Sequence, residues 1–279
     1  MTAIPHKLYE AFEKIRLGKV EEGTRMFDRV QGCDTIKSVA LAELSYFRHD
    51  WKRGMSFVRD FLESEEAWET IRKVRSCTVL HFTLFVLCTC HLDSWKESRD
   101  YLQQLKKQYN DHRPYHQAIS LISDPENTKH RLLESRPKLK EEGKIDLEHL
   151  ELMAESVVPE HSSRRRKTPW RQRWARSFDD VINIAYSKAS TEDIIAIYER
   201  YIKQLEKAES HQEAAKSYIA VGNMSGAREA IRRYMRCWQF KEPYQVAPIV
   251  LFTDHELWAV LSDRRFTESL LTIPHHRES

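Results

Sequence analysis

Large apolar residues recur along this chain at intervals of three and four, the spacing that places them on one face of an α-helix. Four segments share one order of sizes: a large residue, a small one three positions later, and two more large ones at offsets seven and ten. A small side chain lets two antiparallel helices approach closely, because a larger one would push their backbones apart. The segments begin at Val20, Trp51, Trp95 and Met224, and their small residues are Gly23, Gly54, Ser98 and Ala227.

A second helix is predicted before each of these segments, across a short turn. The four turns are expected at Gly18, His49–Asp50, Asp93–Ser94 and Gly222–Asn223. A further hairpin is predicted between Asp179 and Ala208. Ser190 is expected to cap its second helix, with Glu192 and Asp193 in the first turn, where the helix dipole favours negative charge. The pattern therefore predicts an all-α fold of helical hairpins in series.

Residues 211–237 carry a more specific pattern, Ala214-Ala215-x2-Tyr218-x3-Gly222-x4-Ala227-x3-Ile231-x2-Tyr234. It resembles a tetratricopeptide repeat, whose 34-residue unit has small residues, an aromatic and then A-x3-F on its two helices. The other segments keep only the second-helix pattern and lack the closing proline, and the first three start 31 and then 44 residues apart. The resemblance implies a divergent, right-handed solenoid of stacked hairpins that binds other proteins or peptides.

The chain is expected to have four parts: N-terminal hairpins in 1–122, a charged, proline-containing connection in 123–176, C-terminal hairpins in 177–240, and a C-terminal cap in 241–279. In the last part, Pro243 and Pro248 exclude a continuous helix. Thr253-x2-Glu256 has the form of a capping box, which predicts the start of a short helix. A repeat array needs such a cap because its last hairpin leaves the core open.

Composition narrows the class of protein. Only 7 glycines and 9 prolines occur in 279 residues, too few for a turn-rich β-sandwich or barrel, and 29 aromatic residues (7 Trp, 11 Tyr and 11 Phe) exclude full disorder. The longest apolar run, 78–90, is shorter than the roughly 20 residues that cross a bilayer. Five cysteines without framework spacing, and no secretory segment, indicate a reducing, cytoplasmic compartment and no membrane.

The net charge of +3 comes from one segment. Residues 164–176 hold seven basic and no acidic side chains, so the rest of the chain carries −4. Guanidinium groups beside indoles can bind a carboxylate-rich protein surface or a nucleic acid, and the plainer interpretation is a solvated loop anchored by its tryptophans. The residues predicted to bind a partner are Arg164, Arg165, Arg166, Lys167, Trp170, Arg171 and Arg173, the helical stripe Arg228, Arg232 and Arg236, and Tyr218.

An acidic counterpart runs through Asp60, Glu63, Glu65, Glu66 and Glu69. It is interpreted either as the solvated end of a helix or as a surface that meets a basic partner.

The common motifs of enzymes and metal sites are absent from this sequence or incomplete in it. The phosphate-binding, dinucleotide-binding, zinc-protease and nucleophile-elbow motifs do not occur in the sequence. Cys88-Thr89-Cys90-His91 is interpreted as a buried helix, since consecutive residues point about 100° apart and no second ligand pair follows. His112-x3-His116 has metal spacing but no third ligand in register. We therefore predict no catalytic residue, no cofactor and no metal.

These features predict a non-enzymatic protein-binding helical-repeat protein. The preferred hypothesis is a dedicated inhibitor, such as a bacterial toxin-neutralising immunity protein, because degenerate repeats suggest a surface fitted to one ligand. An adaptor, chaperone or peptide receptor is one alternative. A nucleic-acid-binding protein that uses 164–176 is the other.

Overall fold

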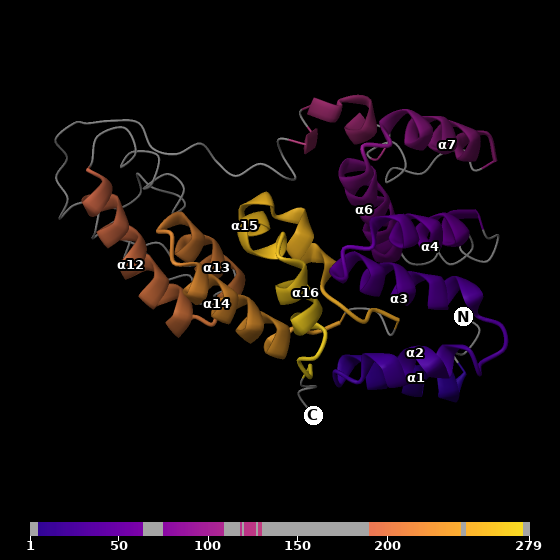
Figure 1. The fold of residues 1–279 in the computed structure, drawn as a ribbon, viewed down its shortest axis with the longest axis horizontal. Helices are drawn as coiled ribbons and strands as arrows, with labels where there is room; N and C mark the ends of the chain where they lie inside the picture. The colour runs from indigo at the N-terminus through magenta and orange to yellow at the C-terminus, as the bar shows by residue number, and fades with distance from the viewer. Residues whose placement is uncertain are drawn as a thin grey trace. The chain divides into compact units, whose positions relative to one another are not determined.

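The computed structural model describes residues 5–63, 75–108, 118, 120–126, 128–129, 190–240 and 244–275. Within these residues every regular element is a helix (Figure 1). The longer helices are α1 (His6–Arg16), α2 (Val20–Phe27), α3 (Asp34–Phe47), α4 (Trp51–Glu63), α6 (Arg75–Leu92), α7 (Trp95–Gln108), α12 (Thr191–Lys207), α13 (His211–Ala220) and α14 (Met224–Cys237). The prediction of an all-α fold is confirmed. No helix of this described part is both long and apolar enough to span a bilayer.

The chain divides into two compact units. Unit 1 comprises Met1–Ser135 and Met235–Ser279, and unit 2 comprises Arg136–Tyr234. Unit 1 contains the hairpins α1–α2, α3–α4 and α6–α7, together with a C-terminal segment of short helices: η2 (Ile249–Thr253), η3 (His255–Leu257), α15 (Trp258–Leu261) and α16 (Arg264–Leu270). Unit 2 contains α12, α13 and most of α14.

Five helices of the described part end in the same way. The residue after the last turn has a left-handed backbone, at Gly18, His49, Asp93, Glu209 and Gly222, with φ between 53° and 78°. The amide of the following residue then bonds to the carbonyl five residues back, as from Asp50 to Ser45 at 2.9 Å. This is the Schellman arrangement, which satisfies the free carbonyls of a helix end. The four predicted turns are confirmed, and the fifth, at Glu209, has no glycine that would indicate it.

The predicted small residues lie at buried positions on their helices. Gly23 and Gly54 are buried, and Ser98 and Ala227 have no exposed surface. A Cβ atom at Gly23 would lie 2.6 Å from the Ala11 carbonyl oxygen of α1, so α1 and α2 touch through their backbones here. At Ser98 the hydroxyl instead bonds to that of Thr89 across α6 and α7, at 2.8 Å.

The predicted cap of α12 is confirmed in detail. The Ser190 hydroxyl accepts the Asp193 amide at 3.2 Å, and the Asp193 carboxylate accepts the Ser190 amide at 3.2 Å. These two bonds form a capping box, which satisfies the first free amides of the helix. The predicted helix before it, near 181–185, lies outside the described residues.

The predicted capping box at Thr253 is wrong. Thr253 is the last residue of η2, and its hydroxyl donates backward to the Val250 carbonyl at 2.7 Å. Asp254 provides the cap, because its carboxylate accepts the Glu256 amide at 3.2 Å. The preceding helical turn therefore decides which of the two adjacent side chains faces the new helix.

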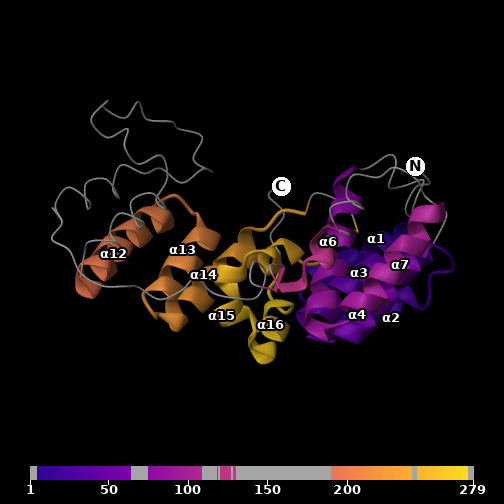
Figure 2. The ribbon, with the colours of Figure 1, turned by 90° about the horizontal axis from the view of Figure 1, so that it is seen from above.

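The C-terminal segment packs on the first hairpins of the chain, within unit 1 (Figures 1 and 2). The ring of Phe252 meets Tyr46 and Phe47 edge-on, at centroid distances of 4.8 and 4.9 Å. Further along, the His275 amide donates to the Arg16 carbonyl at 2.9 Å. Residues 249–275 are thus held to the ends of both α1 and α3.

Candidate functional site

The predicted partner-binding residues separate into two groups. Arg164, Arg165, Arg166, Lys167, Trp170, Arg171 and Arg173 lie outside the described residues. Tyr218, Arg228, Arg232 and Arg236 lie on α13 and α14. The acidic surface is divided likewise: Asp60 and Glu63 are exposed at the end of α4, and Glu65, Glu66 and Glu69 fall outside the described part.

Tyr218 has a clear packing role inside unit 2. Its hydroxyl donates to Glu206 of α12 at 2.9 Å, and the same carboxylate oxygen lies 3.4 Å from Arg233. The ring rests on α14 at Gly226, where a Cβ atom would come within 2.6 Å of it. Tyr218 therefore joins α12, α13 and α14. Arg232 lies 3.6 Å from Glu229 on its own helix, and the binding role of the arginine stripe stays a prediction.

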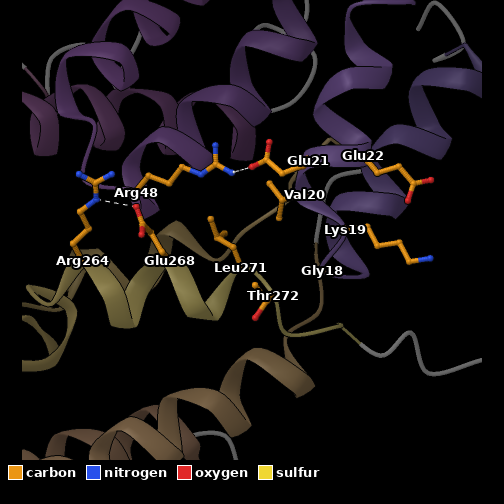
Figure 3. Close-up of a pocket in the computed structure, with 10 residues that line it drawn as sticks. All are labelled: Gly18, Lys19, Val20, Glu21, Glu22, Arg48, Arg264, Glu268, Leu271 and Thr272. Carbon is orange, nitrogen blue, oxygen red and sulfur yellow. Dashed lines mark hydrogen bonds and ion pairs between the residues drawn. The ribbon is translucent and has the colours of Figure 1, made fainter.

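An open cleft of about 560 Å³ lies in unit 1 between the α1–α2 turn and α16 (Figure 3). Its apolar base includes Val20 and Leu271, which are 7% and 6% exposed. Leu17, next to this lining in the sequence, is 49% exposed. The remaining lining residues are Gly18, Lys19, Glu21, Glu22, Arg48, Arg264, Glu268 and Thr272.

Ion pairs hold the charged side chains of the cleft in place. Glu21 of α2 lies 2.6 Å from Arg48 at the end of α3, and Arg264 lies 2.8 Å from Glu268 within α16 (Figure 3). The hydrogen bond from Lys14 lowers the pKa of Glu22. Such exposed pairs contribute little to stability. Their effect is to present both signs of charge around an apolar base.

A second cluster in unit 1 contains two imidazoles between two indoles. His91 stacks on Trp51 with centroids 4.1 Å apart and rings 12° from parallel, and it lies 4.8 Å from Trp258. His49 stacks on the same two indoles, 4.6 Å from Trp51 and 6.1 Å from Trp258. The four rings come from the α3–α4 turn, α4, α6 and α15, so the cluster joins the C-terminal segment to the hairpins.

Hydrogen bonds fix both imidazoles. The Nε2 atom of His49 lies 3.0 Å from the Leu261 carbonyl oxygen and 3.2 Å from the Thr267 hydroxyl, so we assign the ring hydrogen to it. The Nε2 atom of His91 lies 2.9 Å from the hydroxyl of the fully buried Tyr46, which we assign as the donor. Burial lowers the pKa of His91 to about 4, with nearby His49 as the second cause, and burial also lowers the pKa of His49. Both rings are neutral at pH 7.

Two buried ionisable residues, Glu43 and Arg16, bind the backbone of the segment that precedes η2. Glu43 of α3 is fully buried and accepts the amides of Val246 and Ala247, at 2.8 and 3.0 Å. Burial raises the pKa of Glu43 to about 8, and the two amides and Arg16 act in the opposite direction. Arg16 is 2% exposed, donates to the Gln245 carbonyl at 2.9 Å and stacks over Phe240 at 3.6 Å. Glu43 and Arg16 therefore anchor the backbone of residues 245–247, which is not part of a helix.

The interpretation of Cys88 and Cys90 as buried helix residues is confirmed, since they are 0% and 4% exposed. Burial raises the pKa of both thiols, that of Cys90 to about 12, so neither is a thiolate at neutral pH. Within the described ranges, His, Cys, Asp and Glu form no group of three that could hold a metal ion.

Sequence reasoning missed both the cleft and the ring cluster. The sequence pattern identifies His49 only as a turn residue and His91 only as part of a buried helix, because Trp258 and α16 lie far away in the chain. Comparisons with models of protein families, with curated proteins and with solved structures found no match. The function therefore rests on the geometry of this chain alone.

Proposed function

We propose that this chain is a non-enzymatic protein-binding protein, a divergent tetratricopeptide-like solenoid that inhibits one dedicated partner, as a bacterial toxin-neutralising immunity protein does. The observation that carries the proposal is the cleft of unit 1, with Leu17 exposed beside it. Protein interfaces combine an apolar centre with a polar, charged rim in the same way. The repeated left-handed turn supports the solenoid, because it gives successive helix pairs one connecting geometry.

The charges of the cleft favour a protein over other ligands. Its lining contains three cationic residues, Lys19, Arg48 and Arg264, and three acidic residues, Glu21, Glu22 and Glu268. The carboxylates would repel the phosphates of a nucleic acid. A small apolar ligand needs an enclosed pocket, whereas this cleft is open. A protein surface can offer apolar contacts and charges of both signs together.

The anchoring of α16 supports an inhibitor, which benefits from a preorganised surface. At Gly18 the α1–α2 turn has φ 78°, and a Cβ atom there would lie 2.4 Å from the Thr272 carbonyl oxygen. The two walls of the cleft therefore touch through their backbones at this point. A cleft held in this way loses little conformational entropy when a partner binds.

The proposal is tested by capturing the partner on the immobilised full-length chain from a nuclease-treated native lysate of the source organism. Leu17→Asp should reduce capture of one dominant protein at least tenfold. Val250→Asp is the matched control, because Val250 is similarly exposed, at 45%, but lies on η2, whereas Leu17 adjoins the cleft residue Gly18 in the chain. Circular dichroism of both variants checks that they fold.

Each outcome bears on a different part of the proposal. Equal capture by wild type and Leu17→Asp would exclude Leu17 and the adjoining edge of the cleft from the binding surface. Many unrelated proteins, all captured through the cleft, would favour the adaptor or chaperone alternative. Capture from an untreated lysate that is absent from the nuclease-treated one would favour nucleic acid bound through 164–176. Inhibition is tested by assaying the captured protein, or the growth of cells that produce it, with and without this chain.

A further inference from the structure

Three histidines lie where the C-terminal segment, residues 249–275, meets the rest of unit 1. His49 donates to Leu261 of α15 and lies 3.2 Å from Thr267 of α16. The His91 ring lies 4.8 Å from the tilted ring of Trp258 of α15. His275 bonds through its ring Nδ1 atom to the Met235 carbonyl at 2.7 Å and through its own amide to Arg16. Imidazoles therefore hold the segment in its middle, at 258–267, and at its C-terminal end.

The three rings differ in how they could take a second ring hydrogen. A second proton on His91 would fall on Nε2, which already faces the hydroxyl of fully buried Tyr46. His49 directs one N–H at the Leu261 carbonyl, whereas His275 has backbone hydrogen bonds to both Met235 and Val246, which favour its protonated form and offset part of the cost of protonation. Protonation would place a charge on a partly buried ring, between indoles or against Trp238.

The charged neighbours of the three rings only partly offset this cost. Arg264 opposes protonation of His49, while Asp263 and Glu268 favour it, and all three come from α16 or its N-terminal cap. His91 faces His49 from the α3–α4 turn and Tyr46 from α3, and the ring contacts from α4 and α15 are indoles. His275 faces Arg16 of α1.

The pKa values follow from this arrangement. Burial is the first cause that lowers the pKa of each of the three histidines, and the Arg16 charge lowers that of His275 further. A detached segment would expose them, with pKa values near the ordinary value of about 6.5. The detached form then binds more protons, so docking is favoured above about pH 6.5 and weakens as the pH falls.

We propose that residues 249–275 form an acid-released cap, which detaches from the first hairpins when His49, His91 and His275 are protonated. Because α16 is one wall of the cleft, its release dismantles the cleft and frees the bound protein. This last step rests on the proposed function. Release of the cap itself does not, so the two can fail separately.

Hydrogen exchange of the full-length chain, measured by mass spectrometry at pH 7.5 and pH 5 and corrected for intrinsic exchange rates, tests the release. Amides in peptides covering 258–272 should lose protection at least tenfold at pH 5. Amides of α3 should keep theirs, because that helix stays packed in its hairpin. Unchanged protection of 258–272 at pH 5 would overturn the proposal, as would simultaneous loss of protection throughout unit 1.

A non-titrating variant separates protonation from other effects of acid. His49→Gln, His91→Gln and His275→Gln together should keep 258–272 protected at pH 5. The control His6→Gln, at an 85% exposed side chain, should behave like wild type. If the triple variant fails to fold at pH 7.5, His91→Gln alone should move the transition to lower pH, and an unmoved transition would contradict the role of His91.

The effect on binding is measured last, with the protein captured as described above. It should elute from wild type at pH 5 and stay bound to the triple variant. Elution from both would show that the partner, and not the cap, senses acid. Absence of any captured protein would refute the proposed function, and the exchange data would still decide on the cap.

Discussion

Gly23 and Gly54 occupy equivalent positions in two hairpins, but an added methyl group should have opposite effects at the two sites. Both lie inside helices, where alanine is favoured over glycine by about 1 kcal/mol. At Gly54 a Cβ atom would lie 3.4 Å from the Cys88 sulfur, an ordinary contact. At Gly23 it would lie 2.6 Å from both the Ala11 carbonyl oxygen and a side-chain carbon of Ile15.

The expected free energies of unfolding follow from these distances. Gly54→Ala should raise stability by about 0.5 to 1 kcal/mol, because it gains helix propensity at little steric cost. Gly23→Ala must separate α1 from α2, and overpacking of this kind costs about 1–3 kcal/mol, which exceeds the propensity gain. The two variants should therefore differ by about 2 kcal/mol.

Urea unfolding followed by circular dichroism at 222 nm measures this difference. With a slope of about 2 kcal/mol per molar urea, the two midpoints should lie about 1 M apart, on opposite sides of wild type. A midpoint of Gly23→Ala at or above wild type would refute the close contact of α1 and α2. A loss at Gly54 equal to that at Gly23 would refute the distinction between the two hairpins.

Two further predictions concern buried ionisable groups. Because the pKa of Glu43 is raised to about 8, wild type should lose stability relative to Glu43→Gln as pH rises from about 5 to 8, by about 1 kcal/mol per pH unit. Glu43→Ala should be destabilised by about 2–4 kcal/mol, because it leaves the amides of Val246 and Ala247 unpaired. Thermal melts at several pH values check both variants. A stability difference between wild type and Glu43→Gln that does not change with pH would contradict the raised pKa. Exposed Cys237 should react with a thiol reagent in the native protein and buried Cys88 only after unfolding, so fast native labelling of Cys88 would contradict the packing of α6 on α4.

Local signals in the sequence were enough to place the helices and most of their turns. Hydrophobic spacing, a small residue at each close contact and the capping box at Ser190 involve residues within a few positions of one another. Such interactions form whatever lies elsewhere in the chain. The sequence pattern predicted Thr253 as the cap of the short helix, but Asp254 caps it. The backbone of the preceding turn orients both side chains, and the pattern does not contain that information.

The cleft, the ring cluster and the buried carboxyl depend on segments that are far apart in the chain. His49 and Leu261 are separated by 212 positions, and Glu43 and Val246 by 203. Within their local sequence, His49 in its turn and Glu43 on α3 are indistinguishable from polar residues that face water. Only the docking of residues 246–275 on the first hairpins removes that water and supplies the carbonyl and amide partners. The sequence thus determined which helices form, and tertiary packing decided which of their side chains lose solvent and acquire altered chemistry.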